Sequence, residues 1–185
     1  NNYFLMGYQP YFINLVCKKL EEKLKKVNEE FDLRVLYGKE TSIKEILETV
    51  KSYSMFGNKK LVIIKEAQYL SKQISSLIPY LENSLNQTVL VICFVNKVID
   101  KKVKLYKFLF NNTKLIEFRQ LYEADVLKWI NSEVKKFNLN IDPKAAVLMT
   151  SNIGLDLEMI EKAIKKLSMR NDIKDLITVD EIEKY

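Results

Sequence analysis

The first two thirds of the chain alternates between two kinds of hydrophobic pattern. Short apolar or alternating runs, which favour strands, occur at residues 3–6, 31–37, 61–65, 89–95 and 115–118. Between them, apolar residues recur every three or four positions, which predicts helices over residues 10–27, 42–56, 70–85 and 100–110. Strands and helices that alternate at this spacing predict an α/β fold, with a mostly parallel sheet covered by helices on both faces.

From residue 122 onward the pattern indicates helices only. A helical apolar period begins near Val126, and Asp142-Pro143 places an N-cap before a proline at the first helical position. Asp156 or Gly154 starts a further helix, and Thr178 with Glu181 has the spacing of a capping box. The sequence therefore predicts an α/β domain over residues 1–121 and a small all-helical domain over residues 122–185.

The helix predicted at 42–56 has an unusual end. Ser42 and Glu45 form a capping-box pair, and an apolar stripe follows at Ile43, Ile46, Leu47 and Val50, continued by Tyr53 and Ser54. If the helix continues to Gly57, a plausible residue for its C-terminal end, Met55 and Phe56 lie well off this stripe. Either the helix ends earlier and both side chains pack under the sheet edge, or they are exposed and bind a partner. The pattern alone favours local packing.

Composition narrows the class of protein. Nearly half of the residues are hydrophobic, and glycine and proline are scarce, so the chain is ordered and globular. It has no histidine, which excludes the commonest general base and the ordinary zinc sites. Cys17 and Cys93 lie in apolar runs and are expected to be buried free thiols in a reducing compartment. No run is long and apolar enough for a membrane span, so a cytoplasmic location is expected.

Charge is distributed unevenly along the chain. Residues 1–121 carry 20 Lys and Arg against 12 Asp and Glu, whereas residues 122–185 carry 10 against 12. The basic part could face nucleic acid, or its lysines could serve solvation alone. The second interpretation is favoured.

The motifs of nucleotide chemistry are missing. A phosphate loop after the first strand would continue from Gly7 to a second glycine, a lysine and a hydroxyl residue, but Phe12, Ile13 and Asn14 stand there. After the strand at 61–64, Lys65 replaces the aspartate that would hold Mg²⁺, and Glu66 is expected to be a surface carboxylate. No nucleophile with a supporting base is found. Catalysis, bound cofactors and metal ions are therefore not expected.

Several strings along the chain resemble the delta subunit of the bacterial DNA polymerase III clamp loader. The resemblance covers essentially the whole chain and rests on the order and spacing of these strings. They are residues 4–7 with 10–13, 54–64 (SMFGNKKLVII), 98–105 (VIDKKVKL), 127–130 (LKWI), 154–157 (GLDL), Glu161 and 166–167.

The resemblance implies an AAA+ module, consisting of a P-loop-like α/β domain with a degenerate phosphate loop and a helical lid domain. The resemblance further implies that the family's third, collar domain is missing from this chain. It also implies a subunit that neither binds nor hydrolyses ATP, but binds the sliding clamp and helps to open it during DNA replication. The family's main clamp contact maps onto Ser54, Met55 and Phe56, followed by Gly57. Methionine replaces the usual leucine at a similar volume.

With the resemblance, exposure of Met55 and Phe56 becomes the favoured interpretation. The expected partners are the sliding clamp, other clamp-loader subunits and, within the assembled complex, DNA; no membrane is expected. The enzyme to which the subunit would belong is a DNA-directed DNA polymerase. The alternatives are a basic α/β nucleic-acid-binding module and an active P-loop ATPase.

Overall fold

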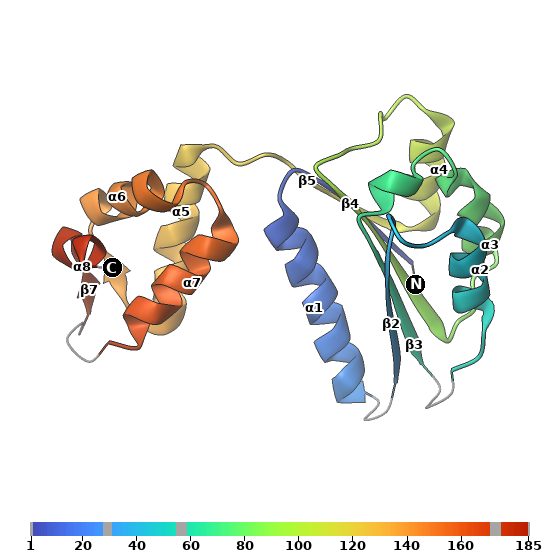
Figure 1. The fold of residues 1–185 in the computed structure, drawn as a ribbon, viewed down its shortest axis with the longest axis horizontal. Coiled ribbons are helices and arrows are strands. Elements are labelled where there is room, and N and C mark those ends of the chain that lie inside the picture. The colour runs from blue at the N-terminus through green and yellow to red at the C-terminus, as the bar shows by residue number, and fades with distance from the viewer. Residues whose placement is uncertain (1, 28–30, 55–58, 171–174, 185) are drawn as a thin grey trace. The chain divides into compact units, whose positions relative to one another are not determined.

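The computed structural model of the protein describes residues 2–27, 31–54, 59–170 and 175–184. The chain forms two compact units, residues 1–120 and residues 121–185 (Figure 1). The first is an α/β unit. Its strands are β1 (Tyr3–Gly7), β2 (Asp32–Tyr37), β3 (Lys60–Lys65), β4 (Thr88–Val95) and β5 (Lys114–Phe118). Its α-helices are α1 (Pro10–Val27), α2 (Ile43–Lys51), α3 (Ile78–Glu82) and α4 (Lys104–Asn112).

The five strands form one parallel sheet in the order β2-β3-β4-β1-β5. This confirms the predicted α/β class and its parallel sheet. Since consecutive strands run in the same direction, each connection must return across a face of the sheet, and the helices provide these crossovers.

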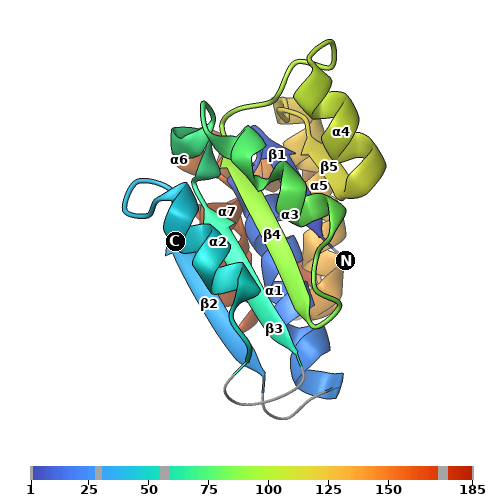
Figure 2. The same cartoon turned by 90° about the vertical axis from the view of Figure 1, so that its right-hand side faces the viewer.

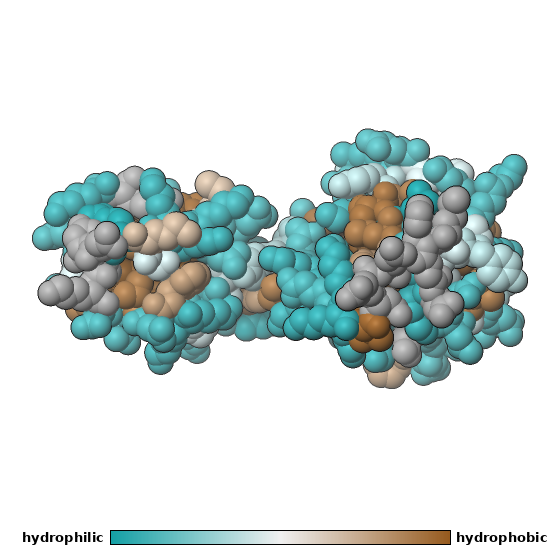
Figure 3. Space-filling view, turned by 90° about the horizontal axis from the view of Figure 1, so that it is seen from below, coloured by the Kyte–Doolittle hydropathy of each residue, from teal (hydrophilic) through white to brown (hydrophobic). Residues whose placement is uncertain are grey.

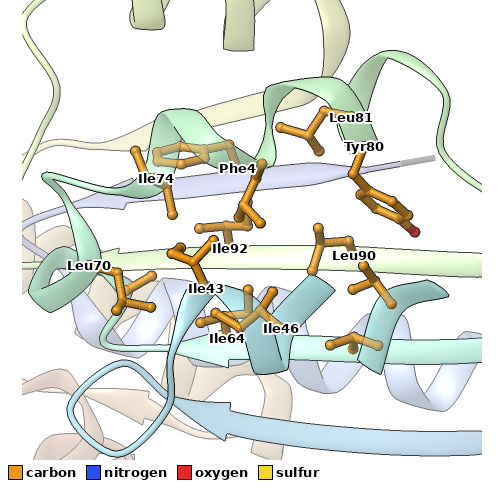
Figure 4. Close-up of a cluster of buried hydrophobic side chains, with 14 of the residues drawn as sticks. Phe4, Ile43, Ile46, Ile64, Leu70, Ile74, Tyr80, Leu81, Leu90 and Ile92 are labelled. Carbon is orange, nitrogen blue, oxygen red and sulfur yellow. The ribbon is translucent and has the colours of Figure 1, made fainter. Parts of the chain in front are cut away.

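Alternation along the strands divides the core into two layers. Phe4, Val62 and Ile92 point to the face covered by α2, α3 and α4, whereas their neighbours Leu5 and Ile63 point to the face covered by α1. Figure 2 shows α2 and α3 in front of the sheet, and Figure 4 shows side chains of the first layer converging between the sheet and these helices. Both faces are therefore buried along the central strands β1, β3 and β4, which explains why their sequences are almost continuously apolar, whereas the edge strand β2 is largely exposed.

The two cysteines meet in the α1 layer. Cys17 on α1 and Cys93 on β4 are buried and free, with their sulfur atoms 3.6 Å apart. The expectation of buried free thiols is confirmed.

The prediction of one continuous helix over residues 70–85 is wrong. The chain instead forms two 3₁₀ segments, η1 (Ala67–Leu70) and η2 (Ile74–Leu77), before the short helix α3. Pro79 stands in the first turn of α3 and has no N–H for a longer helix. The apolar period still places Leu70, Ile74, Leu77 and Leu81 in the core, because a spacing of three or four suits both helix types.

The helix predicted at 100–110 is displaced. The Asp100 carboxylate accepts a hydrogen bond from the Lys102 backbone N–H at 2.8 Å, which closes a turn, and α4 begins only at Lys104. Asp100 therefore caps a turn that precedes the helix.

The second unit is helical, with α5 (Glu123–Val134), the 3₁₀ segment η3 (Lys135–Phe137), α6 (Pro143–Ile153), α7 (Leu157–Ser168) and α8 (Val179–Glu183). Asp142 and Asp156 cap α6 and α7 as expected. The unit also contains a two-stranded parallel sheet, β6 (Asn140–Ile141) and β7 (Leu176–Ile177), that the sequence analysis did not predict. Two residues are too few to show a strand period.

Candidate functional site

The predicted partner-binding segment, Ser54–Gly57, follows helix α2 and precedes strand β3. Ser54 is partly buried, and its hydroxyl makes no hydrogen bond with the described residues. Met55, Phe56 and Gly57 lie outside the described residues. Figure 3 views the α/β unit, at the right, from the end where β2 and β3 begin, and shows apolar (brown) surface among polar (teal) residues.

Helix α2 ends earlier than its sequence pattern indicates. It begins as predicted, with the Ser42 hydroxyl accepting a hydrogen bond from the Glu45 N–H at 3.2 Å, but it ends at Lys51. Ser52 already has extended backbone angles (φ −67°, ψ 148°). The expectation that Tyr53 continues the core stripe is wrong, because its side chain is 82% exposed. A helix that stops at Lys51 no longer constrains where the following side chains point.

Lys60 accounts for the early end of α2. It opens β3, and its side chain lies on the same face as Val62 and Ile64, beneath the C-terminus of α2. Its ammonium donates to the backbone oxygen of Ser52 at 2.6 Å, the Ser52 hydroxyl at 2.7 Å and the Thr49 oxygen at 3.1 Å. The last carbonyls of a helix have no backbone partners within it, so these bonds satisfy part of the helix end, where the Thr49 oxygen also accepts from the Ser52 hydroxyl at 2.9 Å.

The charge of Lys60 is almost completely buried, with 1% of the residue exposed. Burial lowers the pKa of the Lys60 ammonium, while Asp32, whose carboxylate oxygen lies 3.9 Å away, raises it. The helix C-terminus adds a favourable negative potential. The sequence analysis missed this residue, although a lysine at the start of a fully apolar strand was the available signal.

At the opposite end of the sheet, strand β1 leads into helix α1, which is where a phosphate loop would bind a nucleotide. Gly7 ends β1 with φ +138°, and its N–H donates to the Lys97 oxygen at 3.2 Å. The N–H of Tyr8 donates to the Phe118 oxygen at 2.9 Å. In a phosphate loop, such backbone N–H groups must be free to surround the phosphates. Here they already bind protein oxygens.

Aromatic side chains pack together next to the end of β1. Phe12, at the position of a phosphate-loop glycine, stacks on Phe118 with ring centroids 5.9 Å apart, and its ring lies 5.3 Å from that of Tyr11. The side chains after β1 therefore form an apolar cluster where a nucleotide would require exposed backbone and a cation.

No metal-binding arrangement occurs in the described part of the chain. Glu66 has a left-handed backbone (φ 52°), and its side chain is 41% exposed, 4.0 Å from the Lys39 ammonium. The expectation that Glu66 is a surface carboxylate is confirmed. Among the described residues, His, Cys, Asp and Glu form no group of three that could hold an ion. The described helices also include none with the length and apolar character needed to cross a bilayer.

Known proteins show what this chain is similar to. A curated relative, DNA polymerase III subunit delta of Bacillus subtilis, is 20% identical over 191 residues, which cover 98% of this chain and 55% of the relative. The solved structure of the Bacillus subtilis DNA clamp loader delta protein matches with a TM-score of 0.70 at 20% identity, over 99% of this chain and 57% of that one. This chain thus spans little more than half the length of these relatives.

A second solved structure extends the similarity in fold. The Holliday junction branch migration motor RuvB of Thermotoga maritima matches with a TM-score of 0.55 at 12% identity, over 98% of this chain and 60% of that one. At such identities, the structural matches establish the fold, which is that of P-loop NTPases. The family model for the delta subunit of DNA polymerase III matches residues 3–119, more than half of the sequence. The chain belongs to the family of DNA polymerase III delta subunits.

Proposed function

We propose that this chain binds the sliding clamp of DNA replication through Ser54–Gly57 and helps to open it, as a clamp-loader subunit that catalyses no reaction itself. The observation that carries this proposal is the family match over residues 3–119, which includes the entire segment. The segment also has the expected place in the fold, between helix α2 and the third strand along the chain. The resemblance to delta subunits implies a clamp contact at this place.

Clamp binding by this segment would depend on a small apolar contact. Met55 and Phe56 would enter a hydrophobic pocket of the clamp, where a few buried side chains can dominate the binding energy. Binding opens the ring only if the protein has higher affinity for the open form of a clamp interface than for the closed form. Other clamp-loader subunits, and DNA within the assembled complex, are the further partners of this proposal.

A direct titration tests the proposal. The protein, labelled at its N-terminus, is titrated with the sliding clamp of the same organism, and binding is followed by fluorescence anisotropy. We expect saturable binding that changes little between 100 and 300 mM salt, because the contact is apolar. Lack of binding at tens of micromolar clamp would contradict the proposal. Salt-sensitive binding to duplex DNA in its place would favour the basic nucleic-acid-binding alternative.

We further propose that the nucleotide end of the sheet is inactive, since the N–H groups of Gly7 and Tyr8 are already bonded and Phe12 occupies the loop. Millimolar ATP with Mg²⁺ should therefore change the melting temperature of the protein by less than about 1 °C. A ligand at 100 times its Kd would add about 2.7 kcal/mol, a shift of several degrees. An active P-loop ATPase in the same buffer is the control, and a shift of that size in this protein would contradict the prediction.

A further inference from the structure

Lys60 joins the two ends of the proposed clamp-binding segment. It is the first residue of β3, on the C-terminal side of the segment, and its ammonium binds Ser52, on the N-terminal side. The Tyr53 backbone oxygen also lies 3.5 Å from the ammonium. A single buried side chain thus fixes the chain on both sides of residues 54–59.

The contacts of Lys60 differ from those of its neighbour Thr88. The buried Thr88 hydroxyl donates to the Val50 oxygen at 3.3 Å, so it bonds a residue within helix α2. Lys60 instead makes its two shortest hydrogen bonds to Ser52, the first residue after the helix. Both side chains stabilise the end of α2, but only Lys60 holds the residues that lead out of it.

The direction of the chain after Ser52 depends on this anchor. The backbone of Ser52 is held from beneath by the ammonium, whereas the side chain of Tyr53 is 82% exposed. Without the ammonium, the Ser52 oxygen would lose its bond of 2.6 Å, and the Thr49 oxygen would keep only the bond from the Ser52 hydroxyl. Ser52 would then lose both of the side-chain hydrogen bonds that join it to β3.

We propose that Lys60 is a positioning residue for clamp binding, which presents the segment after Ser52 to the clamp by fixing its two ends. This inference rests on the proposed function of Ser54–Gly57. Lys60 itself, being buried, does not touch the clamp. Its contribution is to hold Ser52 and β3, which flank the segment, together before the clamp binds.

A matched pair of substitutions tests the inference. Lys60→Met keeps most of the side-chain length but removes all side-chain donors, and Thr88→Val removes the hydroxyl that bonds Val50 and interacts with Tyr80. We expect both variants to melt at a lower temperature than the wild type. At a temperature where both are fully folded by circular dichroism, Lys60→Met should bind the clamp at least tenfold more weakly, and Thr88→Val within twofold of the wild type.

A double-mutant cycle separates positioning from general destabilisation. If Lys60 acts through the clamp-contacting side chains, Lys60→Met should weaken binding less than threefold when Phe56→Ala is already present. Equal losses in both backgrounds, or wild-type affinity of folded Lys60→Met, would overturn the inference while leaving clamp binding intact. Failure of the wild-type protein to bind the clamp would instead refute the proposed function on which the inference rests.

Discussion

Alanine at both Met55 and Phe56 should reduce the affinity of the protein for the sliding clamp by at least about 100-fold. Complete burial of a Met or Phe side chain contributes about 1.5–3 kcal/mol each, or about 3–6 kcal/mol gross for the pair. A loss of about 2.7 kcal/mol already corresponds to a factor of 100 in Kd. The measurement is the same anisotropy titration with the clamp, accompanied by thermal melting of the variant.

The melting temperature distinguishes a partner contact from core packing. If Met55 and Phe56 contact the clamp, the double variant should melt within about 2 °C of the wild type. A drop of 10 °C or more would mean that both side chains pack inside the protein, which is the alternative that their pattern alone favoured. The matched control replaces two exposed apolar residues at helix α4, Val103 and Phe110, by alanine and should leave clamp affinity unchanged.

Gly7→Ala should destabilise the α/β unit by about 3 kcal/mol or more, lowering the melting temperature by roughly 10 °C. A Cβ atom at Gly7 would lie 2.0 Å from the backbone oxygen of Phe118 and 2.7 Å from its carbonyl carbon. The backbone angle φ of +138° is also unfavourable for alanine. Strand β5 would have to move away from β1, which would break the hydrogen bond from Tyr8 to Phe118.

Gly154→Ala is the control for backbone strain alone. Gly154 also has a positive φ, +83°, but a Cβ there would meet nothing within 4 Å. We expect its cost to be about 1 kcal/mol. If Gly7→Ala melts like Gly154→Ala, the close approach of β5 is not needed for stability. The large difference expected between the two variants would show that Gly7 is required for close packing against β5, independently of any phosphate.

Regular features of the α/β unit could be predicted because they depend on local sequence. Most strands were identified from apolar runs, since burial on both faces leaves no polar period, whereas β2 was identified from the alternation over residues 31–37. The start of α2 at Ser42 and that of α6 at Asp142 followed from side chains that bond N–H groups two or three residues away. Because the two partners of such a hydrogen bond are close in the sequence, it can be predicted from the sequence alone.

The ends of helices were predicted less well. Residues 70–82 kept their buried positions but formed 3₁₀ segments, because the apolar period does not distinguish the two geometries and Pro79 interrupts the hydrogen bonding. Residues 52–54 were predicted to be helical, but α2 ends at Lys51. The candidate segment was identified from family resemblance, and Lys60, which holds its flanks, was not identified at all.

The sequence by itself determined the alternation of strands and helices, the burial of both sheet faces and the loss of the phosphate-loop residues at Phe12, Ile13 and Asn14. Only the tertiary structure decided where α2 ends and why Gly7 is a glycine. The first depends on an ammonium that enters from β3, and the second on a carbonyl of β5 that lies against β1. Both contacts join residues of different strands and helices, whose approach is set by the packing of the whole unit and leaves no periodic trace along the chain.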